Sequence, residues 1–194
     1  MNLIHFALGN LFRRRGEFER AVRVHEHLLA RADLSPGDRH RARYALALDF
    51  LKAGLLDRAE ENLRQLAATP LQNQAWLALL NIHERSRDWE AASRVANQLS
   101  QSGEKGFDVR LSHYLCEQAA ALPVESTSQR LSLLEQACRV APQSVRPLLD
   151  LADELERKGH ANEALEQLLR LVHEMPRFVP LLAAGLTRLA LALE

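Results

Sequence analysis

Hydrophobic residues recur along the chain with the three- and four-residue spacing of amphipathic helices, and short polar stretches separate these segments. In the first segment Leu8 and Phe12 share one face, and after Gly16 the side chains of Ala21 and Leu28 share a face of a second segment. Strands are not predicted, because β-branched residues are scarce and never alternate over a strand's length. The pattern predicts helices near residues 2–14, 18–32, 38–52, 56–68, 71–86, 89–101, 108–122, 127–140, 144–158, 161–174 and 178–192.

A glycine followed five residues later by an alanine marks the turns between paired helices. The pairs are Gly16 with Ala21, Gly54 with Ala59, and Gly159 with Ala164. In the segment RDWEAA, Arg87 stands in the glycine's place and Ala92 in the alanine's. A more degenerate copy places Arg130 at the alanine position, after a first helix that stops at Pro123. The chain is therefore expected to consist of repeated helix–turn–helix pairs.

The length and residue pattern of this repeat identify its type. Small residues such as Gly9 and Ala47 stand where paired helices must approach closely. Pro142 and Pro176 end two repeats that are 34 residues apart. A 34-residue unit with leucine, a small residue, an aromatic residue, glycine, alanine and proline in this order is typical of the tetratricopeptide repeat. The sequence thus predicts an all-α, right-handed superhelical tetratricopeptide-repeat (TPR) solenoid of about five helical hairpins plus a truncated sixth.

One repeat array is expected over residues 1–194. Its repeats fall at about 2–34, 38–70, 73–102, 108–142, 145–177 and, in part, 178–194. Solenoids need polar caps at both ends, whereas here the first helix has no polar leader and the last lacks a partner helix, so a fragment of a longer protein is expected. An exposed apolar face is expected at Leu182, Leu186, Leu189 and Ala190, and open repeat ends of this kind would allow two copies to dimerise.

Composition and charge exclude several classes of function. The 194 residues carry 25 Lys and Arg against 25 Asp and Glu, and a net charge of zero argues against nucleic-acid binding. Phe178–Leu193 is the most apolar stretch, but polar residues interrupt it and it is too short to span a bilayer. Arginines at 13–15 occupy the place of a signal peptide's apolar core. A soluble protein is expected, with Cys116 and Cys138 as small buried residues of a reducing compartment.

Candidate chemistry is sparse. The three His-Glu dipeptides, at His25, His83 and His173, invite comparison with zinc proteases, but none continues into the HExxH motif. Glycine-rich nucleotide-binding motifs are absent from the sequence, and nothing indicates a nucleophile with its base. The sequence therefore predicts neither an enzyme nor a metal or cofactor site.

Binding remains, and in a TPR array the first helices of successive repeats line a concave groove. The groove-side candidates that we single out are Asn10, Arg13, Arg14, Arg41, Tyr44, Lys52, Asn81 and Arg85. The same reasoning places Leu48, Gln74, Leu77, Arg146, Leu149, Asp153 and Arg157 on this side. Such a surface suits an extended or helical peptide with acidic side chains. The alternative is a solvated face on which the arginines pair with neighbours such as Glu17, Asp49 and Glu84.

Two segments carry a more specific resemblance. HFALGNLFRRRGEFERAVRVHEHLLAR, at 5–31, and LALDFLKAGLLDRAEENLRQL, at 46–66, resemble the lipopolysaccharide assembly protein B family. SHYLCEQA, at 112–119, is similar to the fourth repeat of that family. The shared runs HxxLGNLFRxRGExxRAxRxH and AGLxDRAE are more specific than the bare repeat signature.

This resemblance implies an adaptor at the cytoplasmic face of the Gram-negative inner membrane. Family members carry an N-terminal membrane helix and a C-terminal rubredoxin-like domain whose four cysteines bind a metal. They present the deacetylase that commits carbon to lipid A to a membrane-bound, ATP-dependent zinc protease. Neither end domain falls within these 194 residues, so we expect a cytoplasmic fragment with no cofactor of its own. The alternative is a generic peptide-binding TPR module, such as a co-chaperone.

Overall fold

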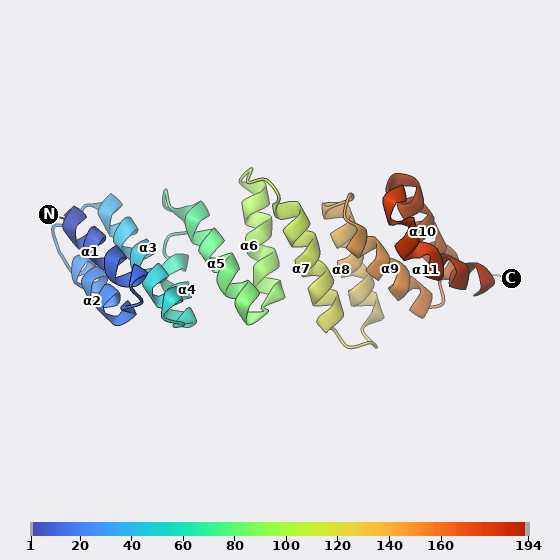
Figure 1. Cartoon of the computed structure of the whole chain (residues 1–194), viewed down its shortest axis with the longest axis horizontal. Helices are drawn as coiled ribbons and strands as arrows, with labels where there is room; N and C mark the ends of the chain where they lie inside the picture. The colour runs from blue at the N-terminus through green and yellow to red at the C-terminus, as the bar shows by residue number, and fades with distance from the viewer. Residues whose placement is uncertain (1, 193–194) are drawn as a thin grey trace. The chain divides into compact units, whose positions relative to one another are not determined.

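The structure, a computed structural model, describes residues 2–192 and, within them, all side chains except those of residues 181 and 192. Over this range it contains helices and no strand, which confirms the all-α class (Figure 1). The elements are α1 (Asn2–Arg14), α2 (Phe18–Leu29), α3 (Pro36–Lys52), α4 (Leu56–Arg64), α5 (Gln72–Ser86), α6 (Trp89–Gln101), α7 (Phe107–Ala121), α8 (Thr127–Val140), α9 (Val145–Arg157), α10 (Ala161–Glu174), the 3-10 turn η1 (Pro176–Phe178) and α11 (Val179–Ala192).

Three helix boundaries differ from the predicted ones by two residues or more. Helix α2 ends at Leu29 rather than 32, and the other two differ for local reasons. Helix α3 begins at Pro36 rather than 38, because the Ser35 hydroxyl caps it by accepting from the Asp38 backbone N–H at 3.2 Å. Helix α4 ends at Arg64 rather than 68. Thr69 precedes a proline and is therefore disfavoured in a helix, and its hydroxyl donates to the Leu66 carbonyl at 2.8 Å.

The helices divide into two compact units between Asp88 and Trp89. The N-terminal unit holds α1 to α5 and the C-terminal unit holds α6 to α11. Helices α5 and α6, which were expected to form the hairpin at 73–102, belong to different units and are described separately. A single array over 1–194 therefore stays a prediction, and its last residues, 193–194, lie outside the described range.

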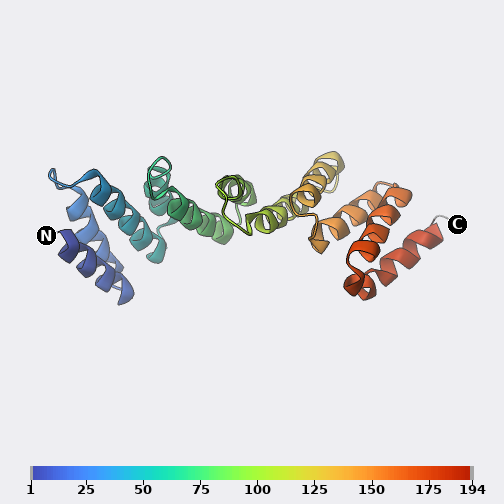
Figure 2. The same cartoon turned by 90° about the horizontal axis from the view of Figure 1, so that it is seen from above.

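Within each unit, successive helices pack side by side (Figures 1 and 2). In the N-terminal unit α2 packs against both α1 and α3, and in the C-terminal unit α10 packs against both α9 and α11. The alanines predicted at the helix crossings have no exposed surface. They are Ala21, Ala59, Ala92 and Ala164. The register of the repeat is confirmed in both units, because only a small side chain fits at so close a crossing.

The turns confirm the same register through their backbone angles. Gly16 and Gly54 both have φ of 79°, and Gly159 has φ of 85°. Arg87, predicted in the glycine's place, also adopts the left-handed conformation, with φ of 56°. A side chain with a Cβ is strained there, so the repeat geometry overrides the local preference of arginine.

The exposed apolar face predicted for the last helix is wrong for two of its four residues. Leu182 and Leu189 are each 1% exposed, because this side of α11 packs against α10. Leu186 is half-buried, and Ala190 is exposed. The leucine spacing marks the face that α11 presents to the preceding helix rather than a face left open.

Candidate functional site

A buried polar network links the first two repeats of the N-terminal unit. His25 and Asp49 are both fully buried, and the His25 Nδ1 lies 2.5 Å from the Asp49 carboxylate. Arg13 donates to the other Asp49 oxygen at 2.8 Å and to the Ala45 carbonyl at 2.9 Å, and it also bonds to the Asn10 side chain. The Asp49 carboxylate thus receives a partner on each oxygen, which is what burial of a charge requires.

Gly9 makes room for this network. A Cβ on Gly9 would lie 2.4 Å from the Cε1 atom of His25, which is well inside contact distance. The Nε2 atom of His25 is buried beside it and has no hydrogen-bond partner. The small residue predicted at the crossing therefore accommodates an imidazole ring.

A cavity of about 370 Å³ lies beside this network, on the side formed by α1, α3 and the start of α5. It is lined by Phe6, Asn10, Arg13, Arg41, Tyr44, Ala45, Leu48, Leu71 and Gln74. Four of the eight candidate groove residues, Asn10, Arg13, Arg41 and Tyr44, therefore meet in one hollow. The other four, Arg14, Lys52, Asn81 and Arg85, are exposed and lie outside it.

The two arginines of this cavity differ in availability. The Arg13 side chain is 18% exposed, and its guanidinium is held by Asp49, Asn10 and a backbone carbonyl. The Arg41 side chain is 62% exposed, and its nearest carboxylate oxygen, on Asp38, is 3.8 Å away. Arg41 also lies over the Phe6 ring at 5.5 Å. Of these two cations, Arg41 is the one that can change partners to receive an anionic group.

Tyr44 adds a hydroxyl group to the wall of this cavity. Burial raises the pKa of the Tyr44 hydroxyl above its ordinary value, and the charge of Arg13 opposes part of that rise. The hydroxyl stays protonated at neutral pH and can donate a hydrogen bond. With Leu48 and Leu71 beside it, the cavity offers a donor, a cation and apolar surface together.

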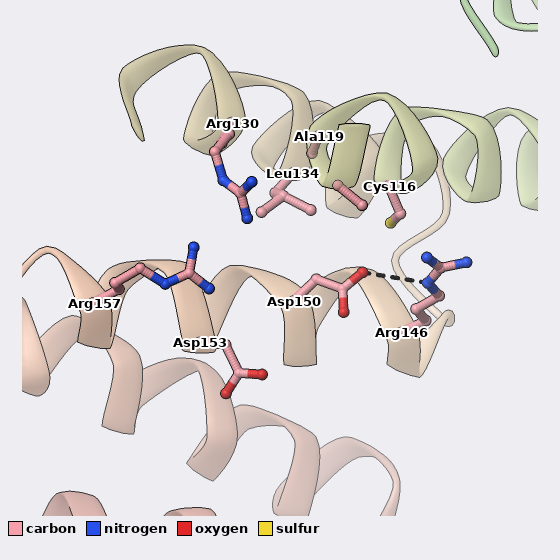
Figure 3. Close-up of a pocket in the computed structure, with 9 residues that line it drawn as sticks. Cys116, Ala119, Arg130, Leu134, Arg146, Asp150, Asp153 and Arg157 are labelled. Carbon is pink, nitrogen blue, oxygen red and sulfur yellow. Dashed lines mark hydrogen bonds and ion pairs between the residues drawn. The ribbon is translucent and has the colours of Figure 1, made fainter. Parts of the chain in front are cut away.

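The C-terminal unit has a smaller pocket, of about 150 Å³, between α7, α8 and α9 (Figure 3). Its lining is Cys116, Ala119, Ala120, Arg130, Leu134, Arg146, Asp150, Asp153 and Arg157. In Figure 3 the side chains of Arg130 on α8 and Arg157 on α9 extend into the same space, and Arg146 contacts Asp150 at 3.3 Å. Of the residues predicted on the groove side, Arg146, Asp153 and Arg157 meet here.

The arginines of this second pocket are paired with carboxylates of the chain. Glu154 is fully buried, and one of its carboxylate oxygens lies 2.9 Å from Arg130 and 2.6 Å from Arg157. Arg146 is 2.8 Å from the Glu117 carboxylate. For these arginines the pairing predicted as the alternative to ligand binding is the observed arrangement. Burial raises the pKa of Asp153, with Arg188 acting in the opposite direction.

Several lining residues were not predicted. Phe6 and Leu71 lie at the ends of the first cavity, and their apolar character gave no signal that distinguished them from core residues. Arg130 was placed at the alanine position of its repeat, but its pairing was not predicted; a charged residue at a position that is otherwise buried is the signal that could have indicated a carboxylate partner. Its partner Glu154 lies on α9, the first helix of the following repeat.

The cysteines are free thiols, and charged side chains lie near both of them. Cys116 is buried as predicted, but the prediction is wrong for Cys138, which is only half-buried. Burial raises the pKa of Cys116 to about 12 and that of Cys138 to about 11. Thiols with such pKa values are poor nucleophiles at neutral pH, which is consistent with the structural role predicted for them.

The described side chains offer no metal centre and the described helices offer no bilayer crossing. Among residues 2–192, no three His, Cys, Asp or Glu side chains come together in a way that would hold a metal ion. In the same range, none of the helices combines the length and apolar character that a membrane span requires.

Comparison with known proteins bears out the repeat and the resemblance. A family model described as tetratricopeptide repeat matches residues 4–39. Lipopolysaccharide assembly protein B of Escherichia coli (strain K12) is 33% identical over 172 residues, or 88% of this chain and 44% of that protein. The protein of the same name from Haemophilus influenzae is 33% identical over 176 residues, or 88% and 43%. The chain thus spans less than half the length of these relatives.

Solved structures show a likeness in fold alone. A crystal structure of MamA protein superposes with a TM-score of 0.54 at 16% identity, covering 92% of this chain and 94% of that one. A second MamA structure gives 0.53 at 18% identity, covering 91% and 92%. The chain is a tetratricopeptide-repeat protein, and over 88% of its length it is related to a region of lipopolysaccharide assembly protein B.

Proposed function

We propose that this chain is a non-enzymatic scaffold that binds other proteins through the surface lined by its first helices. The observation that carries the proposal is the cavity between α1, α3 and α5, in which Arg41 is an exposed cation beside apolar and hydrogen-bonding groups. The TPR fold supports a role in protein interaction, and sequence similarity supports a role in lipopolysaccharide assembly.

The partner segment that fits this cavity carries an acidic side chain next to an apolar one. Its carboxylate would replace Asp38 as the partner of Arg41, at a distance that permits a charge-assisted hydrogen bond. Its apolar neighbour would pack on Phe6 and Leu48, and the Gln74 amide can bond to the backbone of an extended peptide.

By resemblance, the proteins brought together are the lipid A deacetylase and a membrane-bound ATP-dependent zinc protease. The scaffold would act at the cytoplasmic face of the inner membrane and raise the effective concentration of one protein near the other. The residues of this chain would contribute recognition rather than chemistry.

A charge reversal at Arg41 tests this proposal with purified proteins. Arg41→Glu should weaken binding of the deacetylase or of the protease's cytoplasmic region about tenfold in biolayer interferometry. Arg94→Glu is the matched control, because Arg94 is equally exposed, at 64%, and also has one acidic neighbour on its own helix. Equal loss in both variants would mean that net charge, not the cavity, drives binding.

Two other outcomes would redirect the proposal. Binding that survives Arg41→Glu would keep the scaffold and move its contact away from this cavity. Binding of short peptides through a free terminal carboxylate, with neither full-length protein bound, would favour the generic peptide-binding module instead.

A further inference from the structure

Three of the candidate groove residues that lie outside the Arg41 cavity occupy the same position of the repeat. Arg14, Lys52 and Arg85 each stand two residues before the left-handed residue that follows the first helix of a repeat. All three are exposed, and they lie in the last turns of α1, α3 and α5. We call these three residues the cation row.

Helix packing brings the three positions into one line. Helix α3 packs against both α1 and α5 within the N-terminal unit. The residues two positions earlier, Phe12, Phe50 and His83, are buried in all three helices, so the helices present the same side to the core. The axes of packed helices are about 8–10 Å apart, and the row therefore spans about 16–20 Å.

The cations of the row are not paired within the part of the chain that the structure describes. Among residues 2–192, neither Arg14, Lys52 nor Arg85 forms an ion pair. In the C-terminal unit the same position of the repeat is Arg157, which lies 2.6 Å from the carboxylate of Glu154. The repeat can therefore fold with this position paired, and the N-terminal unit leaves it unpaired three times.

A second row, of opposite charge, limits the shape of the partner. Glu19 and Asp57 lie in the first turns of α2 and α4, directly after the turns that follow Arg14 and Lys52, and both are exposed. A flat anionic surface on this edge of the unit would meet these carboxylates as well as the cations. A linear segment can contact the cation row alone. An extended chain advances about 3.3 Å per residue, so about six residues match the length of the row.

We propose that the cation row binds an extended acidic run inside the sequence of a partner protein. Consecutive acidic residues place a carboxylate within reach of each cation in any register, and guanidinium and ammonium groups both form charge-assisted hydrogen bonds with carboxylates. The inference rests on the proposed role in protein binding. It does not rest on the Arg41 cavity, because none of the three residues of the row lines that cavity.

A synthetic acidic run tests the row directly. The probe is a fluorescently labelled peptide with about seven consecutive glutamates and both ends capped. It should bind the wild-type protein at micromolar to submillimolar concentration in an anisotropy titration at low salt, and added salt should weaken the binding because exposed charges are screened. In a series of shorter and longer runs, affinity should rise up to about six glutamates, the length of the row, and then level off.

Charge reversals locate the contact on the protein. Lys52→Glu, at the centre of the row, should weaken binding about tenfold, and Arg14→Glu or Arg85→Glu should each weaken it about threefold. Arg139→Glu is the matched control, because Arg139 is also exposed, lies in the last turn of α8 and gives the same change in net charge. Binding by Arg139→Glu and by Arg41→Glu should stay within about twofold of wild type.

Four results would overturn the proposal. The first is no binding by the folded wild-type protein, with helicity checked by circular dichroism. The second is an equal loss in Lys52→Glu and Arg139→Glu, which would assign the binding to net charge. The third is binding that needs a free terminal carboxylate on the peptide. The fourth is no peptide binding together with row-dependent binding of vesicles of phosphatidylglycerol and phosphatidylcholine, which would assign the row to a membrane surface.

The same titration separates this inference from the proposed function. Peptide binding that is lost in Arg41→Glu and kept in Lys52→Glu would place the acidic segment in the cavity, which overturns the row and supports the proposed function. Peptide binding that is lost in Lys52→Glu and kept in Arg41→Glu supports the row, even if neither the deacetylase nor the protease binds the chain.

Discussion

The two units bury a carboxylate at the same position of the repeat and satisfy it in different ways. Asp49 and Glu154 occupy the same place relative to Gly54 and Gly159, and both are fully buried. In the N-terminal unit each Asp49 oxygen has its own partner. In the C-terminal unit both arginines bond to one Glu154 oxygen, and the other oxygen has no partner.

The difference in partners comes from the second helix of the preceding repeat, which is α2 for Asp49 and α8 for Glu154. In the first repeat the alanine position is kept, and His25 contacts Asp49 from one turn further along α2. In the C-terminal unit the alanine position itself becomes Arg130, whose longer side chain reaches Glu154 and the Leu122 carbonyl. One backbone arrangement thus supports two solutions to the burial of a charge, and the solutions should differ in energy.

The largest effect should come from removal of the buried carboxylates. Asp49→Ala removes the carboxylate partner of both Arg13 and the buried His25. It should lower the free energy of unfolding by about 3–4 kcal/mol. Glu154→Ala should cost only about 1–2 kcal/mol, because Arg157 is 45% exposed, Arg130 keeps its bond to the Leu122 carbonyl, and the desolvation of the unpartnered oxygen is relieved. Urea denaturation of both variants measures the contrast, and equal losses would contradict it.

Gly9→Ala should be the next most damaging substitution, at about 2 kcal/mol, because its Cβ meets the His25 ring. In a His25→Ala background the same change should instead stabilise the protein by up to about 1 kcal/mol, since alanine is the better helix former. Thermal unfolding of the wild type, the two single variants and the double variant measures whether the effect of Gly9→Ala depends on His25. A loss of the same size in both backgrounds would mean that the imidazole is not what excludes a side chain.

Arg130→Ala restores the alanine of the other repeats and should nevertheless destabilise the chain by about 1–2 kcal/mol, because Glu154 loses a bonded partner. Adding Glu154→Leu should recover most of that loss, since an apolar side chain can replace a buried ion pair at little cost. If urea denaturation of the double variant instead gives the sum of the two single losses in free energy of unfolding, the pairing with Glu154 does not explain why arginine stands at position 130.

Arg87→Gly should give the smallest effect and the opposite sign. It removes a left-handed conformation that a Cβ disfavours, so the protein should gain about 0.5–1 kcal/mol in a urea titration. Arg94→Gly, inside α6, should lose about 1 kcal/mol and controls for the loss of an arginine.

Local periodicity was sufficient to predict the helices, the turns and the alanine row. The left-handed angle at Arg87 followed from the repeat register alone, although arginine has no preference for it. Half of the eight candidate groove residues meet in one cavity, because residues on the same face of α1 and α3 are brought together whenever those helices pack. The sequence offered Asp49 among the alternative partners of the arginines, but only the structure shows that Arg13 is the arginine that this carboxylate holds, from 36 positions further along the chain.

Apolar faces show the same division between local and tertiary information. The spacing of Leu182 and Leu189 and that of Ile4 and Leu8 identify helix faces that need a partner. Only packing decides that the first pair is covered by α10 and that the second stays exposed.

The sequence by itself therefore determined the helical class, the repeat and its register, because these depend on residues a few positions apart. The tertiary structure decided which charges are paired, which cavities form and which helix face is left uncovered. These properties depend on contacts between helices from different repeats. The spacing of hydrophobic residues along the sequence does not determine which helices pack against one another.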